Sequence, residues 1–287
     1  MFTSPFRPAG HVAAGPAAPA TALNGHDLVL RYGGRPVVHG VSVALEPGRA
    51  TALVGPNGSG KSTLLRALSR LHRVDGGRVT LGASEERSER DAALLSPRQF
   101  AREVTLFSQS RPAPQGLTVA EVVAFGRHPY RRGFSGPTAE DRTAVDRAMG
   151  VTGVRDMAGR PVGELSGGEM QRVWLAACLA QETGVVLLDE PTNHLDLRYQ
   201  IETLDLVRDL VEDHGIAVGI VLHDLDHACR VADTLVLMCS GRVHAVGAPA
   251  DVLTAENIGE VYDIRVEVGV DSRTGRLRID PLGRHHS

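Results

Sequence analysis

A glycine-rich loop between an apolar strand and a helix constrains the fold of this chain more than any other feature. The loop reads Gly55-Pro56-Asn57-Gly58-Ser59-Gly60-Lys61-Ser62-Thr63. It follows the apolar run 50–54 and leads into a helical pattern over 62–71. Glycines allow backbone N–H groups to face an anion, and a helix N-terminus adds partial positive charge. We therefore predict that the loop binds the phosphates of a nucleotide, with the Ser62 hydroxyl placed for Mg²⁺.

Lysine occurs once in the sequence, and it lies in this loop. Of the 31 lysine and arginine residues, Lys61 is the single lysine. A compact ammonium on a flexible stem can fold over the loop to the β- and γ-phosphates, a space that a planar guanidinium fits poorly. We infer that phosphate chemistry selected the residue at this position, and we assign Lys61 a catalytic as well as a binding role.

Two adjacent carboxylates end a second apolar strand, 185–189. They are Asp189 and Glu190. Asp189 is predicted to hold the Mg²⁺ shell, and Glu190 to orient or deprotonate the water that attacks the γ-phosphate. An apolar strand that ends in Asp-Glu is common, so this prediction depends on the loop upstream.

Strand and helix patterns alternate along most of the chain, which predicts an α/β fold. Strands are expected at 27–32, 37–45, 50–54, 77–81, 104–109, 185–189, 216–222 and 234–238, and helices at 62–71, 200–212 and 224–231. Weaker strand patterns occur at 243–246 and 264–268. Residues 110–182 instead show helical stretches between turns rich in Pro and Gly, which predicts a helical insert within the α/β frame.

Composition limits the classes of partner. Hydrophobic residues make up 42% and charged residues 23% of the chain, as in globular proteins. The net charge of -3 predicts no general affinity for nucleic acid. No apolar run approaches the length needed to span a bilayer. The cysteines Cys178, Cys229 and Cys239 lie in apolar segments and are expected to be buried free thiols.

The N-terminal residues 1–25 are rich in Ala, Pro and Gly. We expect them to form a disordered extension. The alternative is a targeting peptide, but prolines and glycines would interrupt its apolar region.

A third motif reads Leu165-Ser166-Gly167-Gly168-Glu169-Met170-Gln171-Arg172 and lies one helix before the acidic strand end. It resembles the signature motif of ATP-binding cassette ATPases. Tyr32, Gln109, Asp196 and His223 stand in the order and spacing of further cassette motifs. Glu169 departs from that family, which more often has Gln at this position.

This resemblance covers about residues 25–250 and implies a fold. The expected architecture is a P-loop NTPase (RecA-like) core with an antiparallel β subdomain and a helical insert subdomain at about 110–182. The cassette domain would span 26–250, and 251–287 would be a C-terminal extension.

The resemblance also implies roles for single residues. Ser166, Gly167 and Gly168 would bind the nucleotide of a second copy, so that two chains hold two ATP molecules head-to-tail. Asp196 would contribute to nucleotide binding, and Tyr32 would stack on adenine. Gln109 would contact Mg²⁺ and serve catalysis, and His223 would be catalytic. The open alternatives are a surface aromatic at 32, an ordinary strand end at 109 and a helix neighbour without catalytic duty at 223.

Weaker signals bear on the cargo. The segment Thr118–Pro129, the stretch Pro191–Gln200 and the residues Val252–Thr254 and Val261-Tyr262 resemble cassette ATPases of ferric-siderophore, haem and cobalamin importers. The resemblance implies an ATP-hydrolysing subunit at the cytoplasmic face of the membrane, bound to an integral membrane permease. An extracytoplasmic substrate-binding protein is implied indirectly.

Ferric siderophore is the preferred cargo, with haem or cobalamin as alternatives. A split exporter, a cassette acting on nucleic acid or ribosomes and a permease-free scaffold for cofactor assembly also stay open. A plain amphipathic helix is the alternative for 118–129.

Overall fold

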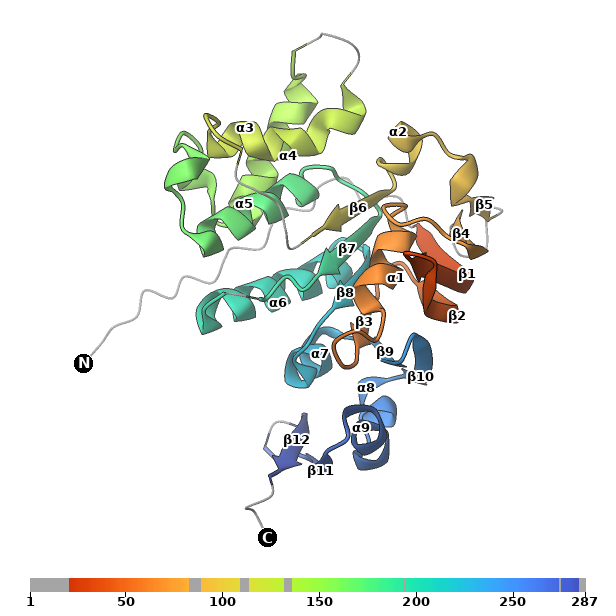
Figure 1. Ribbon diagram of the computed structural model, residues 1–287. Coiled ribbons are helices and arrows are strands. Elements are labelled where there is room, and N and C mark those ends of the chain that lie inside the picture. The colour runs from red at the N-terminus through yellow and green to blue at the C-terminus, as the bar shows by residue number, and fades with distance from the viewer. Residues whose placement is uncertain are drawn as a thin grey trace, which may run out of the picture. The chain divides into compact units, whose positions relative to one another are not determined.

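The computed structural model of the chain describes residues 21–82, 89–108, 114–131, 136–193, 195–273 and 275–283. These residues fall into two compact units. The helical unit comprises the described residues between 114 and 181, and the larger unit comprises the others (Figure 1).

Six of the described strands form the central sheet of the larger unit, in the order β10-β9-β3-β8-β7-β6. Their bounds are β3 Ala50–Val54, β6 Val104–Phe107, β7 Val185–Asp189, β8 Ala217–Val221, β9 Thr234–Cys239 and β10 Arg242–Gly247. All neighbouring pairs are parallel except β9 and β10. Strands β3, β7 and β8 are buried along their whole length, which explains why the sequence shows them as continuous apolar runs.

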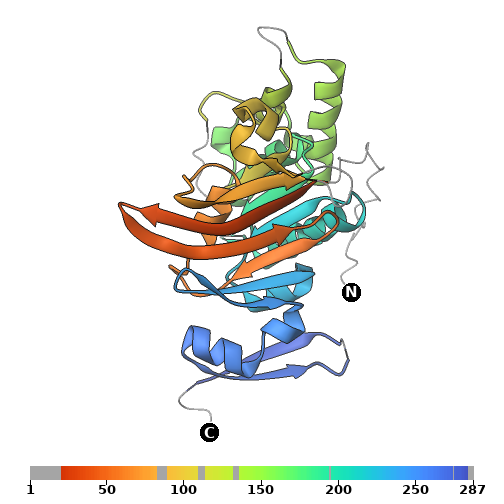
Figure 2. The same ribbon diagram turned by 90° about the vertical axis from the view of Figure 1, so that its right-hand side faces the viewer.

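A second, antiparallel sheet has the order β2-β1-β4-β5. Its strands are β1 Ala22–Tyr32, β2 Arg35–Leu45, β4 Gly76–Gly82 and β5 Arg90–Asp91. The long pair β1 and β2 is drawn in red in Figure 2. Helix α1 (Lys61–Leu68) contacts β1 and β2 on one side and β7 and β8 on the other. Its residues Leu64, Leu65 and Leu68 are fully buried, so the core of this unit joins both sheets through α1.

The prediction of a disordered extension over 1–25 is wrong at its end, because β1 begins at Ala22. Leu23 is fully buried and pairs with Leu45 of β2 and Leu81 of β4. These partners are distant in sequence, so the short run before Asn24 shows no strand pattern by itself. Residues 1–20 lie outside the described residues.

The remaining elements of the larger unit lie in two parts of the chain, directly after β5 and after β7. They are the 3₁₀ turn η1 (Ala92–Leu94), α2 (Pro97–Phe100), α6 (Leu197–Glu212), α7 (Leu225–Val231), α8 (Pro249–Val252), α9 (Ala255–Tyr262), β11 (Arg265–Val270) and β12 (Leu277–Leu282). Helix α9 contacts β10 and β11, and α7 contacts β12. The segment beyond residue 250 therefore packs onto the rest of this unit (Figure 1, blue).

The helical unit packs three helices around an apolar core. Its elements are α3 (Val119–Val123), the 3₁₀ turn η2 (Ala124–Tyr130), α4 (Ala139–Val151), the turns η3 (Arg155–Met157) and η4 (Val162–Glu164), and α5 (Gly167–Leu179). Val119 and Val122 of α3 and Val173 of α5 lie in this core. Thr118 and Thr138 begin α3 and α4 with capping boxes, which fix where these helices start.

Within the described ranges, no helix combines the length and the apolar character needed to cross a membrane. Cys178, Cys229 and Cys239 are free thiols, as predicted, but the prediction that all three are buried is wrong, because Cys229 and Cys239 are partly exposed. Burial, followed by the nearby carboxylates of Asp226 and Asp224, raises the pKa of Cys229 to about 11. This thiol is therefore protonated and unreactive at neutral pH.

Candidate functional site

Three neighbouring strands of the larger unit end at one edge of the sheet and carry the predicted site. Strand β3 leads into the glycine-rich loop, β7 ends at Asp189, and β8 leads to His223. Strand β8 pairs in parallel with both β3 and β7. Because carboxyl ends of parallel strands meet at the same edge, the loop, the carboxylates and His223 are brought together.

Two glycines let the loop lie close to neighbouring backbone. Gly55 has a φ of 143°, and a Cβ atom there would lie 2.1 Å from the carbonyl oxygen of Met238 in β9. Gly60 has a φ of 100°, and its Cβ would lie 3.0 Å from the carbonyl oxygen of Val37 in β2. Side chains at these positions would displace the loop, so glycine is needed to hold it against both strands.

Lys61 is buried, with 4% of its surface exposed, and its ammonium is bonded to the loop itself. Nζ donates to the carbonyl oxygens of Gly55 at 2.7 Å and Pro56 at 2.9 Å, and to Ser59 Oγ at 3.5 Å. Burial lowers the pKa of Lys61, while the carboxylates of Glu190 and Asp189 oppose that shift. The one lysine of the chain thus lies in the electrostatic field of both acidic residues.

Asp189 is almost fully buried at the end of β7. Burial raises its pKa, and the Ser62 hydroxyl and the Arg66 guanidinium oppose this shift by stabilising the charged carboxylate. Arg66 Nη2 lies 3.7 Å from Asp189 Oδ2. The other oxygen, Oδ1, is buried and has no hydrogen-bond partner among the described residues. A buried oxygen of this kind beside a hydroxyl fits Mg²⁺, which prefers hard oxygen ligands.

Glu190 is held on both sides by hydrogen bonds. Asn193 Nδ2 donates to Oε2 at 2.5 Å, and His223 Nε2 is hydrogen-bonded to Oε1. The backbone of Glu190 has a φ of 53°, in the left-handed region that non-glycine residues rarely adopt. Its N–H donates to Val221 in β8 at 3.2 Å, which helps to hold this conformation. A fixed carboxylate beside a histidine can orient a water molecule or accept its proton.

Tyr32 lies at the end of β1 with 48% of its surface exposed. Its ring centroid is 4.6 Å from that of His72, at an interplanar angle of 40°. His72 Nε2 is also 3.1 Å from the carbonyl oxygen of Arg31. The pair offers an exposed aromatic surface of the kind on which a base can stack.

Asp196 is the N-cap of α6. Its Oδ1 accepts a hydrogen bond from the backbone N–H of Tyr199 at 3.0 Å. The side chain therefore has a structural duty, and the nucleotide contact implied for it stays a prediction. Gln109 lies outside the described residues.

The signature residues belong to the helical unit, where Ser166 is the N-cap of α5 and Gly167 and Gly168 form its first turn. Ser166 and Glu169 complete a capping box, with Ser166 N–H to Glu169 Oε2 at 2.8 Å and Glu169 N–H to Ser166 Oγ at 3.3 Å. Glu169 thus finds a local role where the family more often has Gln. These hydrogen bonds and the nearby Arg160 lower the pKa of Glu169.

Two residues near this site were not predicted from the sequence. Arg66, one helical turn after Ser62, reaches Asp189. The four-residue spacing places Ser62 and Arg66 on the same face of the helix, and this spacing could have predicted the contact. Tyr262, at the end of α9, was seen only as part of a resemblance. Its phenol oxygen is buried near the Gly55 backbone and has no hydrogen-bond partner among the described residues. Burial raises the pKa of Tyr262 to about 12.

The fold and the strand-end site define an ATPase with a phosphate-binding loop. The family model of the ABC transporter matches residues 38–193. The chain belongs to this family.

Two ATP-binding proteins of transport systems are similar to this chain over most of its length. It is 42% identical over 262 residues to the ferric enterobactin transport ATP-binding protein FepC of Escherichia coli, covering 91% of this chain and 94% of that protein. It is 43% identical over 255 residues to the cobalamin import ATP-binding protein BtuD of Halobacterium salinarum, covering 89% of this chain and 62% of that protein.

The fold is also that of a solved cassette. The ADP conformation of MJ1267, an ATP-binding cassette of an ABC transporter, superposes with a TM-score of 0.72 at 24% identity. The match covers 85% of this chain and 98% of that one. The α/β fold with a P-loop core, an antiparallel sheet and a helical insert is therefore confirmed.

Proposed function

We propose that this chain is the ATP-hydrolysing subunit of an importer for ferric siderophores. The carboxylate of Glu190, fixed by Asn193 and His223 at the strand ends beside the loop, carries the proposal for hydrolysis. The names of the relatives support ferric siderophore as the cargo. Besides the ferric enterobactin protein, relatives named for siderophore and achromobactin transport are 40% identical and are matched over 94% and 96% of their lengths. A haem or cobalamin importer is the alternative, with the same ATPase and another cargo.

In this mechanism, backbone N–H groups of the loop and the Lys61 ammonium bind the phosphates of ATP. Tyr32 stacks on the adenine. Glu190 orients the attacking water and accepts its proton, and His223 stabilises the carboxylate in the position that in-line attack requires. Positioning of this kind is the main contribution a protein makes to phosphoryl transfer.

Ser62 and Asp189 would hold Mg²⁺, with Gln109 as a further ligand. When bound, the ion supplies charge neutralisation between the phosphates. Asp189 suits this role because one of its buried oxygens has no hydrogen-bond partner among the described residues.

The second half of the nucleotide site comes from another copy of the chain. Ser166, Gly167 and Gly168 start α5, and the N–H groups of such a helix end favour phosphate. Asp196 lies at the same dimer interface in this proposal. Two copies would enclose two ATP molecules head-to-tail, and hydrolysis would reopen the dimer.

Coupling to transport follows from differential affinity. If ATP binds the closed dimer more tightly than the open one, its binding energy drives a permease attached to the two cassettes. The chain would then work at the cytoplasmic face of the membrane, bound to an integral membrane permease. An extracytoplasmic substrate-binding protein would deliver the cargo.

Uptake measurements in the native host test this proposal. Cells carrying Glu190→Gln are compared with cells carrying Glu202→Gln, an exposed position on α6, for uptake of radiolabelled ferric siderophore, haem and cobalamin. Selective loss of ferric-siderophore uptake in Glu190→Gln alone supports the proposal. Loss of haem or cobalamin uptake instead corrects the cargo. Unchanged uptake of all three contradicts the importer role and favours a split exporter or a permease-free cassette.

A further inference from the structure

The end of α5 opposite the signature residues is held by the turn η2. Gly126 in η2 lies so close to α5 that a Cβ atom there would be 2.0 Å from the carbonyl oxygen of Ala177. An alanine at this position would therefore push η2 away from the helix. The glycine permits the side chains that follow it to reach the last carbonyl groups of α5.

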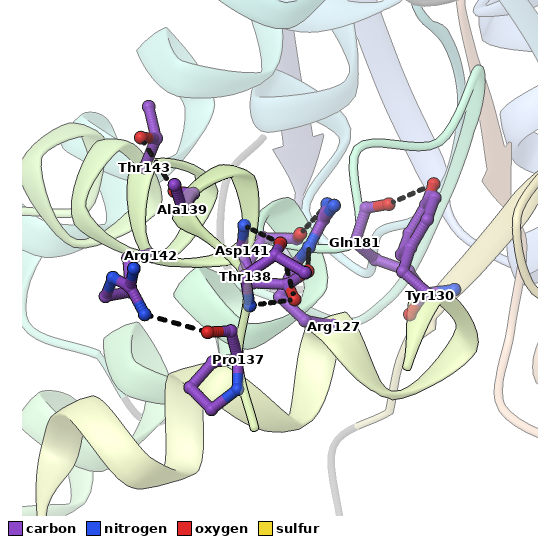
Figure 3. A network of polar contacts seen from close by, with 10 residues as sticks. Arg127, Tyr130, Pro137, Thr138, Ala139, Asp141, Arg142, Thr143 and Gln181 are labelled. Carbon is purple, nitrogen blue, oxygen red and sulfur yellow. Dashed lines mark hydrogen bonds and ion pairs between the residues drawn. The ribbon is translucent and has the colours of Figure 1, made fainter. Parts of the chain in front are cut away.

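Arg127 makes the central contact (Figure 3). The residue is 4% exposed. Its Nε donates to Asp141 Oδ1 at 2.9 Å, and its Nη1 donates to the carbonyl oxygen of Ala180 at 2.9 Å. The second oxygen of Asp141 accepts hydrogen bonds from the N–H and the hydroxyl of Thr138, both at 2.9 Å. One guanidinium thus links the start of α4 to the end of α5.

Tyr130 completes the arrangement. Its hydroxyl donates to the carbonyl oxygen of Gln181 at 2.9 Å, and its ring lies 4.0 Å from the Arg127 guanidinium carbon. Gln181 is the last residue of the helical unit. Helix ends leave their last carbonyl groups without intrahelical partners, and a cation there also suits the helix dipole.

The carbonyl group of Ala180, at the end of α5, is satisfied by a buried ion pair, Arg127 with Asp141, which has a high desolvation cost. Burying two charges costs much of what their attraction returns, so such a pair is weak evidence for stability, and in some proteins it serves to fix a definite geometry. The planar fork of arginine fixes direction, because its N–H groups bond two partners at once. Helix α5 is 13 residues long, so its ends lie about 20 Å apart. As a rigid rod, it carries any displacement at Ala180 to Ser166.

We propose that Arg127, Tyr130 and Asp141 form a clamp that fixes the direction of α5 and thereby positions Ser166 for ATP hydrolysis in the dimer. These are positioning residues, since they lie at the opposite end of the helix from Ser166. The inference rests on the proposed contact of Ser166 with the partner's nucleotide.

The test uses the purified full chain with Arg127→Met, and Arg142→Ala as the control. Arg142 is exposed on the same helix as Asp141, and its side chain donates to the carbonyl oxygen of Pro137 (Figure 3). The loop lies in the other unit, so ATP affinity of Arg127→Met is expected to stay within about twofold of the native value. Its kcat is expected to fall by about tenfold or more, because small misplacements of a positioned group are costly. The control keeps native kcat. Native kcat in Arg127→Met would overturn the proposal.

Arg127→Lys separates positioning from stability. Lysine keeps the charge beside Asp141 but lacks the fork that reaches Ala180 as well. We expect its melting temperature to recover toward the native value while its kcat stays low. Recovery of kcat in step with the melting temperature would show a merely structural role and contradict the clamp. If Arg127→Met does not fold, Tyr130→Phe is measured instead, with the same expected loss of kcat at unchanged ATP affinity.

Ser166→Arg separates a failure of the clamp from a failure of the proposed nucleotide contact of Ser166. If Ser166→Arg hydrolyses ATP normally, the proposed role of the signature residues fails, and the clamp fails with it. If Ser166→Arg blocks hydrolysis while Arg127→Met and Tyr130→Phe do not slow it, the clamp alone is wrong.

Discussion

His223 is hydrogen-bonded to the carboxylate of Glu190, although 33 residues separate the two in sequence. The contact joins the ends of β8 and β7, which are neighbours in the sheet. Asn193 holds the other oxygen of the same carboxylate. The conformation of Glu190 is thus set by a strand end, a turn and a histidine from another strand.

Glu190→Gln should bind ATP and nearly stop its hydrolysis. The amide has almost the same shape but cannot accept a proton, and loss of such a base costs about 100-fold or more in rate. Phosphate release measures the rate, and gel filtration with ATP should show a trapped dimer. Glu202→Gln serves as the control, and normal turnover in Glu190→Gln would refute the assigned role.

His223→Ala should lower kcat more than it raises KM. The histidine contacts Glu190 rather than the loop, so its removal frees the carboxylate without weakening the phosphate cradle. An effect confined to the reaction step appears as a loss of kcat at nearly constant KM. Steady-state kinetics decide this, and a rise in KM at constant kcat would point to a binding role instead.

Lys61→Ala should abolish tight ATP binding, and Lys61→Arg should not restore it. The ammonium is buried within a loop whose own backbone surrounds it, so the larger guanidinium has no room. Calorimetric titration with ATP measures the affinity. Arg242→Lys, at an exposed position of β10, is the matched exchange. Native affinity in Lys61→Arg would contradict the explanation of the single lysine.

The free energy of unfolding should fall as the pH rises in the alkaline range, because Tyr262 titrates there. Its pKa is raised by burial to about 12 from 10.0, so the folded chain holds this proton more tightly than the unfolded chain. The resulting stability is present below pH 10 and is lost as the pH rises toward 12. After allowance for partial solvent screening, the free energy of unfolding should drop by about 1–2 kcal/mol over this interval.

Urea unfolding at several pH values checks this expectation, with Tyr262→Phe for comparison. The variant keeps the ring and lacks the titrating group, so its stability should fall less steeply between pH 10 and 12. Equal slopes for both proteins would assign the alkaline loss of stability to other groups.

The parts of the fold that the sequence predicted well are those determined locally. Strands β3 and β7 have the predicted bounds because both are buried on all sides and form unbroken apolar runs. The loop residues, the carboxylates after β7 and His223 after β8 were found because each follows such a strand. The roles assigned to them stay predictions.

The missed features depend on contacts between distant segments. Leu23 belongs to β1 because Leu45 and Leu81 pair with it, and no local pattern shows this. Tyr262 lies near the backbone of Gly55, more than two hundred positions away in sequence. The segment around Gly126 and Arg127 was read as a weak family resemblance, and its physical basis, a tight approach to α5, requires the folded unit.

The bonds of Lys61 to Gly55 and Pro56 have a consequence for turnover. In the proposed mode of ATP binding, phosphate oxygens would compete with carbonyl oxygens that already hold the ammonium, so nucleotide binding would be an exchange of partners. The same exchange would operate in reverse when product leaves. A lysine with acceptors of its own would lose little on release, which would limit product affinity and shorten the time that a spent nucleotide occupies the loop.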